Sequence, residues 1–221
     1  MKLPILEKTF GAVYLFAYGA ATWDWHRMHY DLELARSRGL PGAVIDGQMY
    51  GALFARAAMD WAGARGFVTR LSFRMKSMAF AGDTLRAEGE LTGVREQAAV
   101  LAQRLTKGAT LVADATTEVR LAWDEQAMPG ANLPVGLARL PGSAFRALVR
   151  FPAGWSRPGS GSYSAAEEFT VLEGDLGMNG KTWRKGEHAS IAAGEQRRNS
   201  SSASGCVAFA RFDADPRWTP A

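Results

Sequence analysis

An acid–base pair, Asp24 and His29, lies five residues apart, shortly before the most apolar helix that the sequence predicts. A carboxylate and an imidazole suit general acid–base chemistry, because both can exchange protons with a bound molecule. The predicted helix begins at Asp46 and Gly47, and the free N–H groups at the start of a helix can polarise a carbonyl oxygen. Together these features indicate proton transfer beside a carbonyl group.

Each of these residues also has a purely structural interpretation. Asp24 could cap a helix or a turn, His29 could be a polar residue with an ordinary partner, and Gly47 could be needed only for close packing. We interpret Asp24 and His29 as catalytic and the Gly47 N–H as the donor to a carbonyl oxygen. Three neighbours could line the same site: Trp23, His26 and Asp46.

Three helices are predicted in the first half of the chain, over Val13–Ala21, Leu32–Arg38 and Asp46–Ala64. Asp46 is a suitable N-cap for the third helix, and Gly63 marks its end. Apolar residues at helical spacing cover most of this helix, so we expect it to be buried. Four aromatic residues of this half are expected mainly in the core: Trp23, Trp25, Tyr50 and Trp61.

Apolar and polar residues alternate over residues 70–76, 85–91 and 110–121, and a less regular run covers residues 101–105. Alternation with period two predicts strands, and turns that contain glycine between the runs predict antiparallel pairing. One buried helix and one antiparallel sheet predict an α+β domain in which the sheet wraps around the helix.

The second half of the chain has no helical period. Short strand candidates are separated by glycine and serine turns: Phe145–Phe151, Glu168–Leu172, Leu176–Met178, Ser190–Ala192 and Val207–Phe212. This pattern predicts an all-β sandwich or barrel over residues 143–221. Residues 124–142 contain three prolines and three glycines without a clear period, so we expect a linker there, after a first domain over residues 1–123.

The composition makes several classes of protein improbable. The 221 residues are 47% hydrophobic and 22% charged, which is typical of a globular core. The net charge is only +4 and the basic residues are scattered, so no nucleic-acid partner is expected. Cys206 is the only cysteine, which excludes an internal disulfide. No uncharged run approaches the length of about 18 residues that a membrane span needs, and no secretory layout is present. We expect a cytoplasmic protein without a membrane partner.

Three motifs in the first half resemble those of MaoC-like hot-dog proteins. Residues 26–31 resemble the family's run His-Arg-Ile-His-Tyr-Asp, residues 39–47 resemble the glycine-containing run that follows it, and residues 80–85 resemble a turn that links two strands. The resemblance covers residues 5–123 and is nearest to 3-hydroxyacyl thioester dehydratases. It implies a hot-dog fold with a catalytic pair at Asp24 and His29.

Two positions depart from the MaoC-like pattern. Members of the family often have His at the position of Asp46 and Asn at the position of His26. The negative charge of Asp46 would weaken an oxyanion site at Gly47, unless this carboxylate caps the helix instead.

The second half resembles a cupin in its residues 167–174, and Gly186 and Gly194 fit the frame of the second cupin motif. The resemblance implies a cupin-like β-barrel. The metal ligands of cupins are missing, because no histidines stand before Glu167 and Arg197 occupies the place of a later histidine. One carboxylate is too few ligands for a divalent metal, so we expect none. We expect Glu167 and Arg197 to form an ion pair inside the barrel, with contact to a ligand as the alternative.

These resemblances imply a hydro-lyase without a cofactor, which hydrates or dehydrates an enoyl or 3-hydroxyacyl thioester of coenzyme A or acyl carrier protein. Two alternatives remain open. One is an inactive hot-dog and cupin protein that binds a small molecule. The other is a polyketide-type tailoring enzyme that uses the same residues for an elimination or cyclisation. The resemblance also implies a homodimer in which the partner's sheet closes the acyl tunnel.

Overall fold

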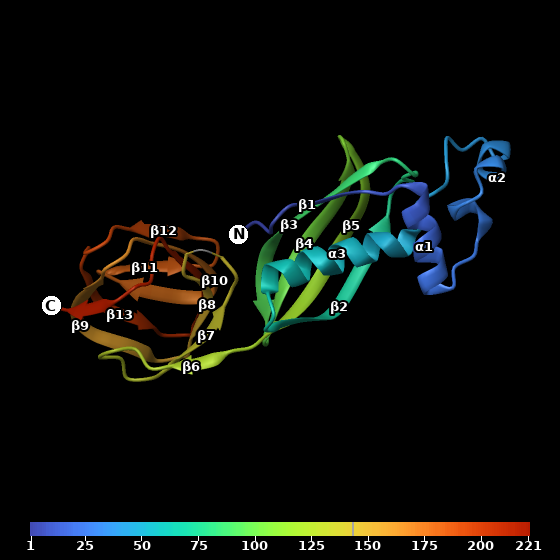
Figure 1. Cartoon of the computed structure of the whole chain (residues 1–221). Helices are drawn as coiled ribbons and strands as arrows, with labels where there is room; N and C mark the ends of the chain where they lie inside the picture. The colour runs from blue at the N-terminus through green and yellow to red at the C-terminus, as the bar shows by residue number, and fades with distance from the viewer. Residues whose placement is uncertain (143) are drawn as a thin grey trace. The chain divides into compact units, whose positions relative to one another are not determined.

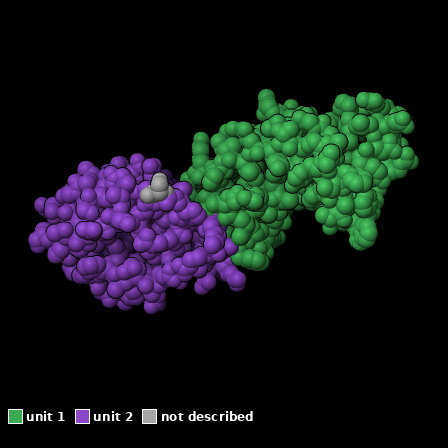
Figure 2. Space-filling view, in the orientation of Figure 1, with its two compact units in different colours: residues 1–61, 67–91, 100–119 green, residues 62–66, 92–99, 120–221 purple. Residues whose placement is uncertain are grey.

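The computed structural model describes residues 1–142 and 144–221; residue 143, the expected start of the second domain, lies outside the described residues. The chain divides into two compact units (Figure 2). Unit 1 contains residues 1–61, 67–91 and 100–119, and unit 2 contains residues 62–66, 92–99 and 120–221. Each unit has its own hydrophobic core and is described separately.

A five-stranded sheet in the order β1-β3-β4-β5-β2 forms most of unit 1. Its strands are β1 (Leu6–Thr9), β2 (Gly66–Met75), β3 (Thr84–Arg95), β4 (Ala98–Lys107) and β5 (Thr110–Leu121). Two-residue loops connect β3 to β4 and β4 to β5, and loops this short join antiparallel strands. The three strands predicted from the alternation and the less regular strand over residues 101–105 are confirmed, whereas β1 was not predicted.

Helix α3 (Gly47–Ala62) lies against this sheet (Figure 1). Asp46 caps it, because its Oδ1 accepts a hydrogen bond from the Gln48 N–H at 2.8 Å. The helix ends before Gly63, whose φ of +73° lies in the left-handed region that favours glycine. The predicted cap and the predicted end of this helix are both confirmed.

The apolar face of α3 fills the core of unit 1, as its pattern predicts. Tyr50 and Phe54 are almost completely buried, and they pack with residues of β3, β4 and β5. One polar link crosses this core: the Gln103 side chain donates to the Phe54 carbonyl at 3.1 Å and accepts from the Thr117 hydroxyl at 2.5 Å. These two bonds pair both the nitrogen and the oxygen of the buried Gln103 amide and connect helix α3 to the sheet.

Three short helical segments precede α3: α1 (Ala12–Thr22), the 3₁₀ helix η1 (Arg27–His29) and α2 (Leu32–Ser37). The expectation that Trp23 and Trp25 lie in the core is wrong, since they are 79% and 40% exposed. Trp23 follows α1 with a φ of +59°, so the chain turns there and its indole projects outward. The two indole rings pack against each other, with centroids 6.0 Å apart.

Unit 2 is an all-β structure with a ten-stranded sheet. Its strands are β6 (Asp124–Gln126), β7 (Val135–Arg139), β8 (Arg146–Phe151), β9 (Trp155–Tyr163), β10 (Glu167–Met178), β11 (Lys181–Arg184), β12 (His188–Ile191), β13 (Arg197–Ser202), β14 (Cys206–Phe212) and β15 (Trp218–Pro220). The main order is β15-β9-β13-β10-β14-β8-β7-β6, and β11 and β12 also pair with β10.

The expected linker over residues 124–142 is part of this sheet. Strands β6 and β7 pair with each other, and β7 pairs with β8. Both strands are short, and most of the prolines and glycines lie in the turn between them or just after β7, which obscures the alternation. The segment therefore belongs to the second fold rather than separating two folds.

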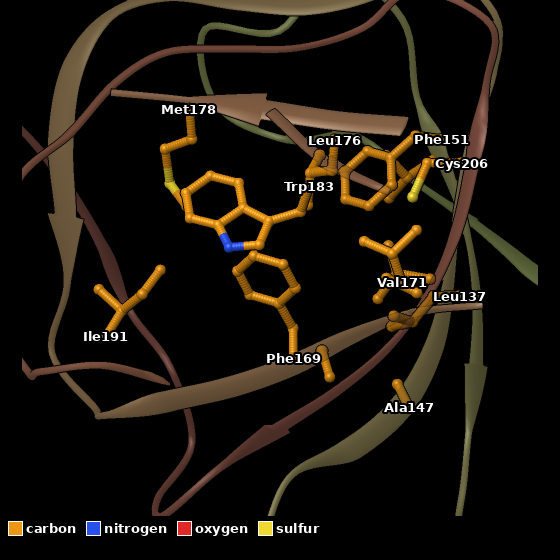
Figure 3. Packing of buried hydrophobic residues seen from close by; sticks show 14 of the residues in the cluster. Leu137, Ala147, Phe151, Phe169, Val171, Leu176, Met178, Trp183, Ile191 and Cys206 are labelled. Atoms are coloured by element: carbon orange, nitrogen blue, oxygen red, sulfur yellow. The ribbon is translucent and has the colours of Figure 1, made fainter. Parts of the chain in front are cut away.

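The core of unit 2 lies between its strands (Figure 3). Phe169 and Trp183 pack edge to face with ring centroids 5.4 Å apart. Cys206 is buried beside β10, as the sequence predicts, and burial raises the pKa of its thiol to about 12. A fully protonated thiol in this core packs as a small apolar group.

Candidate functional site

Asp24 is positioned by a tight turn after α1. Its Oδ1 accepts a hydrogen bond from the His26 N–H at 3.1 Å. Its backbone carbonyl lies so close to α1 that a Cβ added to Gly19 would be only 2.7 Å from the carbonyl oxygen. Glycine at position 19 therefore lets the chain fold back and bring the Asp24 side chain towards the start of α3.

His29 is oriented by a backbone carbonyl. Its Nδ1 lies 2.8 Å from the carbonyl oxygen of Val44, two residues before Asp46. A carbonyl oxygen only accepts, so Nδ1 carries the hydrogen and the neutral ring has its lone pair at Nε2. A second contact, from the Val44 N–H to the Met28 carbonyl at 3.0 Å, ties η1 to the segment before α3. The ring is thus held with its basic nitrogen available.

Asp46 contributes a second carboxylate at the same place. The residue is only 7% exposed, and one of its oxygens caps α3. The other oxygen, Oδ2, is buried and has no hydrogen-bond partner in the described residues. An unpaired buried carboxylate oxygen is unfavourable, which suggests that a bound group satisfies it.

The fold brings Asp24, His29 and Asp46 together. One ligand atom of each residue lies within 4.8 Å of the others. Two carboxylates and an imidazole form a donor set that a divalent transition metal can also use. The hollow beside them has a volume of about 0 Å³, so it has no room for a water molecule.

Tyr18 is a member of this cluster that the sequence interpretation missed. It lines the same hollow as the three charged or titratable residues. Burial raises the pKa of Tyr18, and the charges of Asp46, Tyr14 and Asp24 raise it further. The phenol therefore stays protonated and can donate a hydrogen bond. Its spacing from Leu15 and Gly19 on one face of α1 is the signal that could have revealed it.

Gly47 is the first residue of α3, so its N–H has no acceptor within the helix. A side chain on this residue would collide with the sulfur of Met75. The Met75 side chain is flexible and exposed, so it can move, and close packing does not by itself require glycine here.

His26 and Trp23 lie away from the hollow. His26 is exposed, and its Nδ1 accepts from the Met28 N–H at 3.3 Å, which caps η1. Its ring centroid is 5.9 Å from that of His29. Trp23 projects into solvent, as described above. Of the three side chains considered as lining, only Asp46 joins the cluster.

A hollow of about 980 Å³ in unit 1 does not contain Asp24, His29 or Asp46. It lies on the sheet, beside charged side chains of β2, β3 and β4 such as Arg74, Glu88 and Arg104. This hollow and the cluster of titratable residues therefore lie at different places in unit 1. The cluster is the stronger candidate for chemistry, because it combines titratable groups with a buried oxygen that has no hydrogen-bond partner among the described residues.

In unit 2 the expected pair of Glu167 and Arg197 is confirmed. Arg197 Nη2 lies 2.8 Å from Glu167 Oε2, and the two side chains are 2% and 14% exposed. Burial raises the pKa of Glu167, while the neighbouring Arg197 acts in the opposite direction. The guanidinium provides the positive charge beside the carboxylate.

Known proteins similar to this chain match its first half. Residues 10–113 match the family model of the MaoC like domain. The (R)-specific enoyl-CoA hydratase of Aeromonas caviae is 29% identical over 122 residues, which are 52% of this chain and 90% of that protein.

Solved structures match a similar share of the chain. The (R)-hydratase from A. caviae involved in PHA biosynthesis has a TM-score of 0.52 at 28% identity, over 55% of this chain and 95% of that one. The ChsH1–ChsH2 complex from Mycobacterium tuberculosis has a TM-score of 0.53 at 22% identity, over 55% of this chain and 96% of that one. Residues 10–113 therefore match the MaoC like domain, and the structural similarity supports a hot-dog fold for this part of the chain.

Across residues 1–142 and 144–221, no helix is both long enough and apolar enough to cross a membrane.

Proposed function

We propose that the hot-dog domain hydrates enoyl thioesters and dehydrates 3-hydroxyacyl thioesters, carried by coenzyme A or acyl carrier protein. The observation that carries this proposal is the convergence of Asp24 and His29 at the start of α3, within 4.8 Å of each other. The similarity to an (R)-specific enoyl-CoA hydratase supports the same chemistry.

In the dehydration direction, His29 Nε2 takes the proton from the α-carbon. Asp24 accepts a hydrogen bond from the hydroxyl group on the β-carbon and orients it, and the proton that His29 has taken passes to this hydroxyl group, so that water departs. In hydration the same groups act in reverse, and water adds its hydroxyl to the β-carbon and its proton to the α-carbon. The orientation of the His29 ring by the Val44 carbonyl supports this division of roles.

The thioester oxygen gains negative charge as the α-proton moves. We propose that the Gly47 N–H and the N-terminal end of α3 stabilise it. Asp46 directs its Oδ1 to the Gln48 N–H, which leaves the N–H of Gly47 for the substrate. The Tyr18 hydroxyl is a further donor in the same hollow.

The test is turnover of crotonyl-CoA and of both enantiomers of 3-hydroxybutyryl-CoA by the full chain, followed by the absorbance of the enoyl thioester. We expect hydration of the first and dehydration of one enantiomer. The absence of turnover with these and with the matching carrier-protein thioesters would reject the hydratase.

A second candidate function is favoured by the closed hollow of about 0 Å³ and by the negative charge of Asp46. In this case the hot-dog domain is inactive and the chain binds a small molecule. Binding of an acyl thioester without turnover would support this alternative over catalysis.

We propose that the chain is a homodimer joined through its hot-dog sheets. Strand β2 is an edge of the sheet, and open edges favour pairing with a second copy. Two side chains of β2, Phe67 and Met75, are 60% and 64% exposed. A partner strand beside β2 would cover this apolar surface.

We further propose that residues 1–123 form one domain and that the strands beginning at β6 form a cupin-like barrel without a metal. The end of β5 at Leu121 and the start of β6 at Asp124 support this division. The pairing of Glu167 with Arg197 supports a barrel in which a guanidinium replaces the usual metal.

A further inference from the structure

The interior of unit 2 contains a cavity with more positive than negative charge. The cavity has a volume of about 50 Å³. Its polar lining consists of Arg157, Tyr163, Glu167, Arg197 and Ser200. The two arginines are 6% and 3% exposed, so both guanidinium groups are removed from water. Two buried cations face one carboxylate, which leaves a formal excess of one positive charge.

The hydrogen bonds inside the cavity are incomplete. Arg197 uses Nη2 for Glu167, while its Nε and Nη1 are buried and have no partner in the described part of the chain. Arg157 donates from Nη1 to the Tyr163 hydroxyl at 3.2 Å, and its guanidinium lies 3.6 Å from the centre of the Trp218 ring. Buried charged donors without acceptors are costly, so an acceptor that enters this cavity would be stabilising.

The size of the cavity limits the molecule that could enter. A water molecule occupies about 10–15 Å³ on this scale, so 50 Å³ holds about four water-sized groups. Acetate has four non-hydrogen atoms. The remaining walls are apolar, with Phe169 and Met178 among them. A short alkyl group would contact these walls while a carboxylate faces the arginines.

The charges favour a monoanion. One carboxylate neutralises the formal excess of one positive charge, whereas a dianion would face the Glu167 carboxylate with no cation left to balance it. A guanidinium presents parallel N–H groups that match a carboxylate. Burial raises the pKa of Tyr163, so its hydroxyl remains a donor rather than a competing anion.

We propose that the cavity inside unit 2 binds a small monocarboxylate of about the size of acetate or propionate, held by Arg197 and Arg157. This site is separate from Asp24 and His29 and does not depend on the hydratase chemistry. It gives the barrel a ligand in place of a metal.

The experiment is a calorimetric titration of the full chain with sodium acetate and sodium propionate, repeated with inorganic phosphate and sodium chloride at equal ionic strength. We expect saturable binding of a monocarboxylate and none of phosphate. Saturable binding should also raise the melting temperature of the protein. If no monocarboxylate binds saturably, or if phosphate binds more tightly, the proposal is overturned.

Variants then locate the site. Arg197→Met should weaken binding of the monocarboxylate at least about tenfold, a loss of about 1.4 kcal/mol. Arg198→Met is the matched control, because Arg198 is exposed on the same strand. Arg197→Met leaves Glu167 buried without its partner, so the double variant Glu167→Gln/Arg197→Met tests the same loss in a core without that unpaired charge. Undiminished binding in either folded variant would overturn the assignment.

Discussion

Replacing Asp24 with Asn separates the chemistry of this residue from its structural contact. The amide oxygen of Asn can still accept the hydrogen bond from the His26 N–H, which is 3.1 Å in length, so the turn after α1 should persist. The change removes the negative charge and the ability to take up a proton. Because Asp24 is only partly buried and keeps this contact, we expect the free energy of unfolding to change by less than about 0.5 kcal/mol.

The expected loss of activity is much larger. General acid–base catalysis by one group contributes about 10²–10⁴-fold, so kcat for crotonyl-CoA should fall by that factor in Asp24→Asn. In free energy this is about 3–5 kcal/mol of the activation barrier. The loss should appear mainly in kcat rather than in KM, because the acyl chain and its carrier keep their contacts.

His29→Ala should give a loss of the same order, because Nε2 of this ring is the proposed acceptor of the α-proton. Asp60→Asn is the matched control for a carboxylate on the same domain. Asp60 pairs with Arg56 on the exposed side of α3, at 2.8 Å, and should leave kcat unchanged. Circular dichroism and urea unfolding would show that each variant is folded. Near-normal turnover in both Asp24→Asn and His29→Ala would show that the site is assigned wrongly.

Three further outcomes are expected. Elemental analysis of the purified chain should give no stoichiometric iron, zinc or manganese, and a metal that is lost in Glu167→Ala would contradict the proposed barrel. Burial raises the pKa of the Cys206 thiol from its ordinary value of 9.0 to about 12, so the thiol should react with a disulfide reagent at pH 8 only after unfolding. The folded thiol keeps its proton up to a higher pH than the unfolded thiol does. The free energy of unfolding should therefore fall as the pH rises from about 9 to about 12, and it should fall less steeply in Cys206→Ala. Light scattering at micromolar concentration should give twice the chain mass of 23.9 kDa, and a fully active monomer would refute the shared tunnel.

The sequence predicts unit 1 better than unit 2, for a physical reason. In unit 1 one face of each long strand packs on α3, so residues alternate between buried and exposed, as in β5. Strand β13 contains two arginines, an asparagine and three serines, and the interior of unit 2 buries three of them, Arg197, Ser200 and Ser202. A pattern based on hydrophobicity cannot detect such a strand.

The interruption of β10 shows a second limit. Two short strands were predicted where the structure has one, because a bulge lies between Val171 and Glu173 and Gly174 adopts a φ of +73°. A bulge shifts which residues face the core, so the alternation changes phase within one strand. Gly174 also permits close contact with Gly205, which a larger residue would block.

The candidate site was predicted in its parts but not in its geometry. Spacing and resemblance identified Asp24 and His29, and the structure brings them together with Asp46. The part played by Tyr18 depends on how α1 packs against the start of α3, which is a tertiary contact. The outward position of Trp23 depends on a left-handed residue at the end of α1, for which tryptophan gives no signal.

The two oxygens of Asp46 have separate surroundings, and two substitutions can distinguish their effects. Asp46→Ala removes the cap of α3 and should lower the free energy of unfolding by about 1 kcal/mol. Asp46→Asn keeps an oxygen for the Gln48 N–H and removes a charge beside Asp24, so its stability should equal or exceed that of the wild type. Because the charge of Asp46 helps to raise the pKa of Tyr18, that pKa should fall in both variants, as followed by NMR of labelled tyrosine. If Asp46→Asn destabilises the protein as much as Asp46→Ala, the cap is not what Asp46 contributes, and the buried charge itself holds the site together.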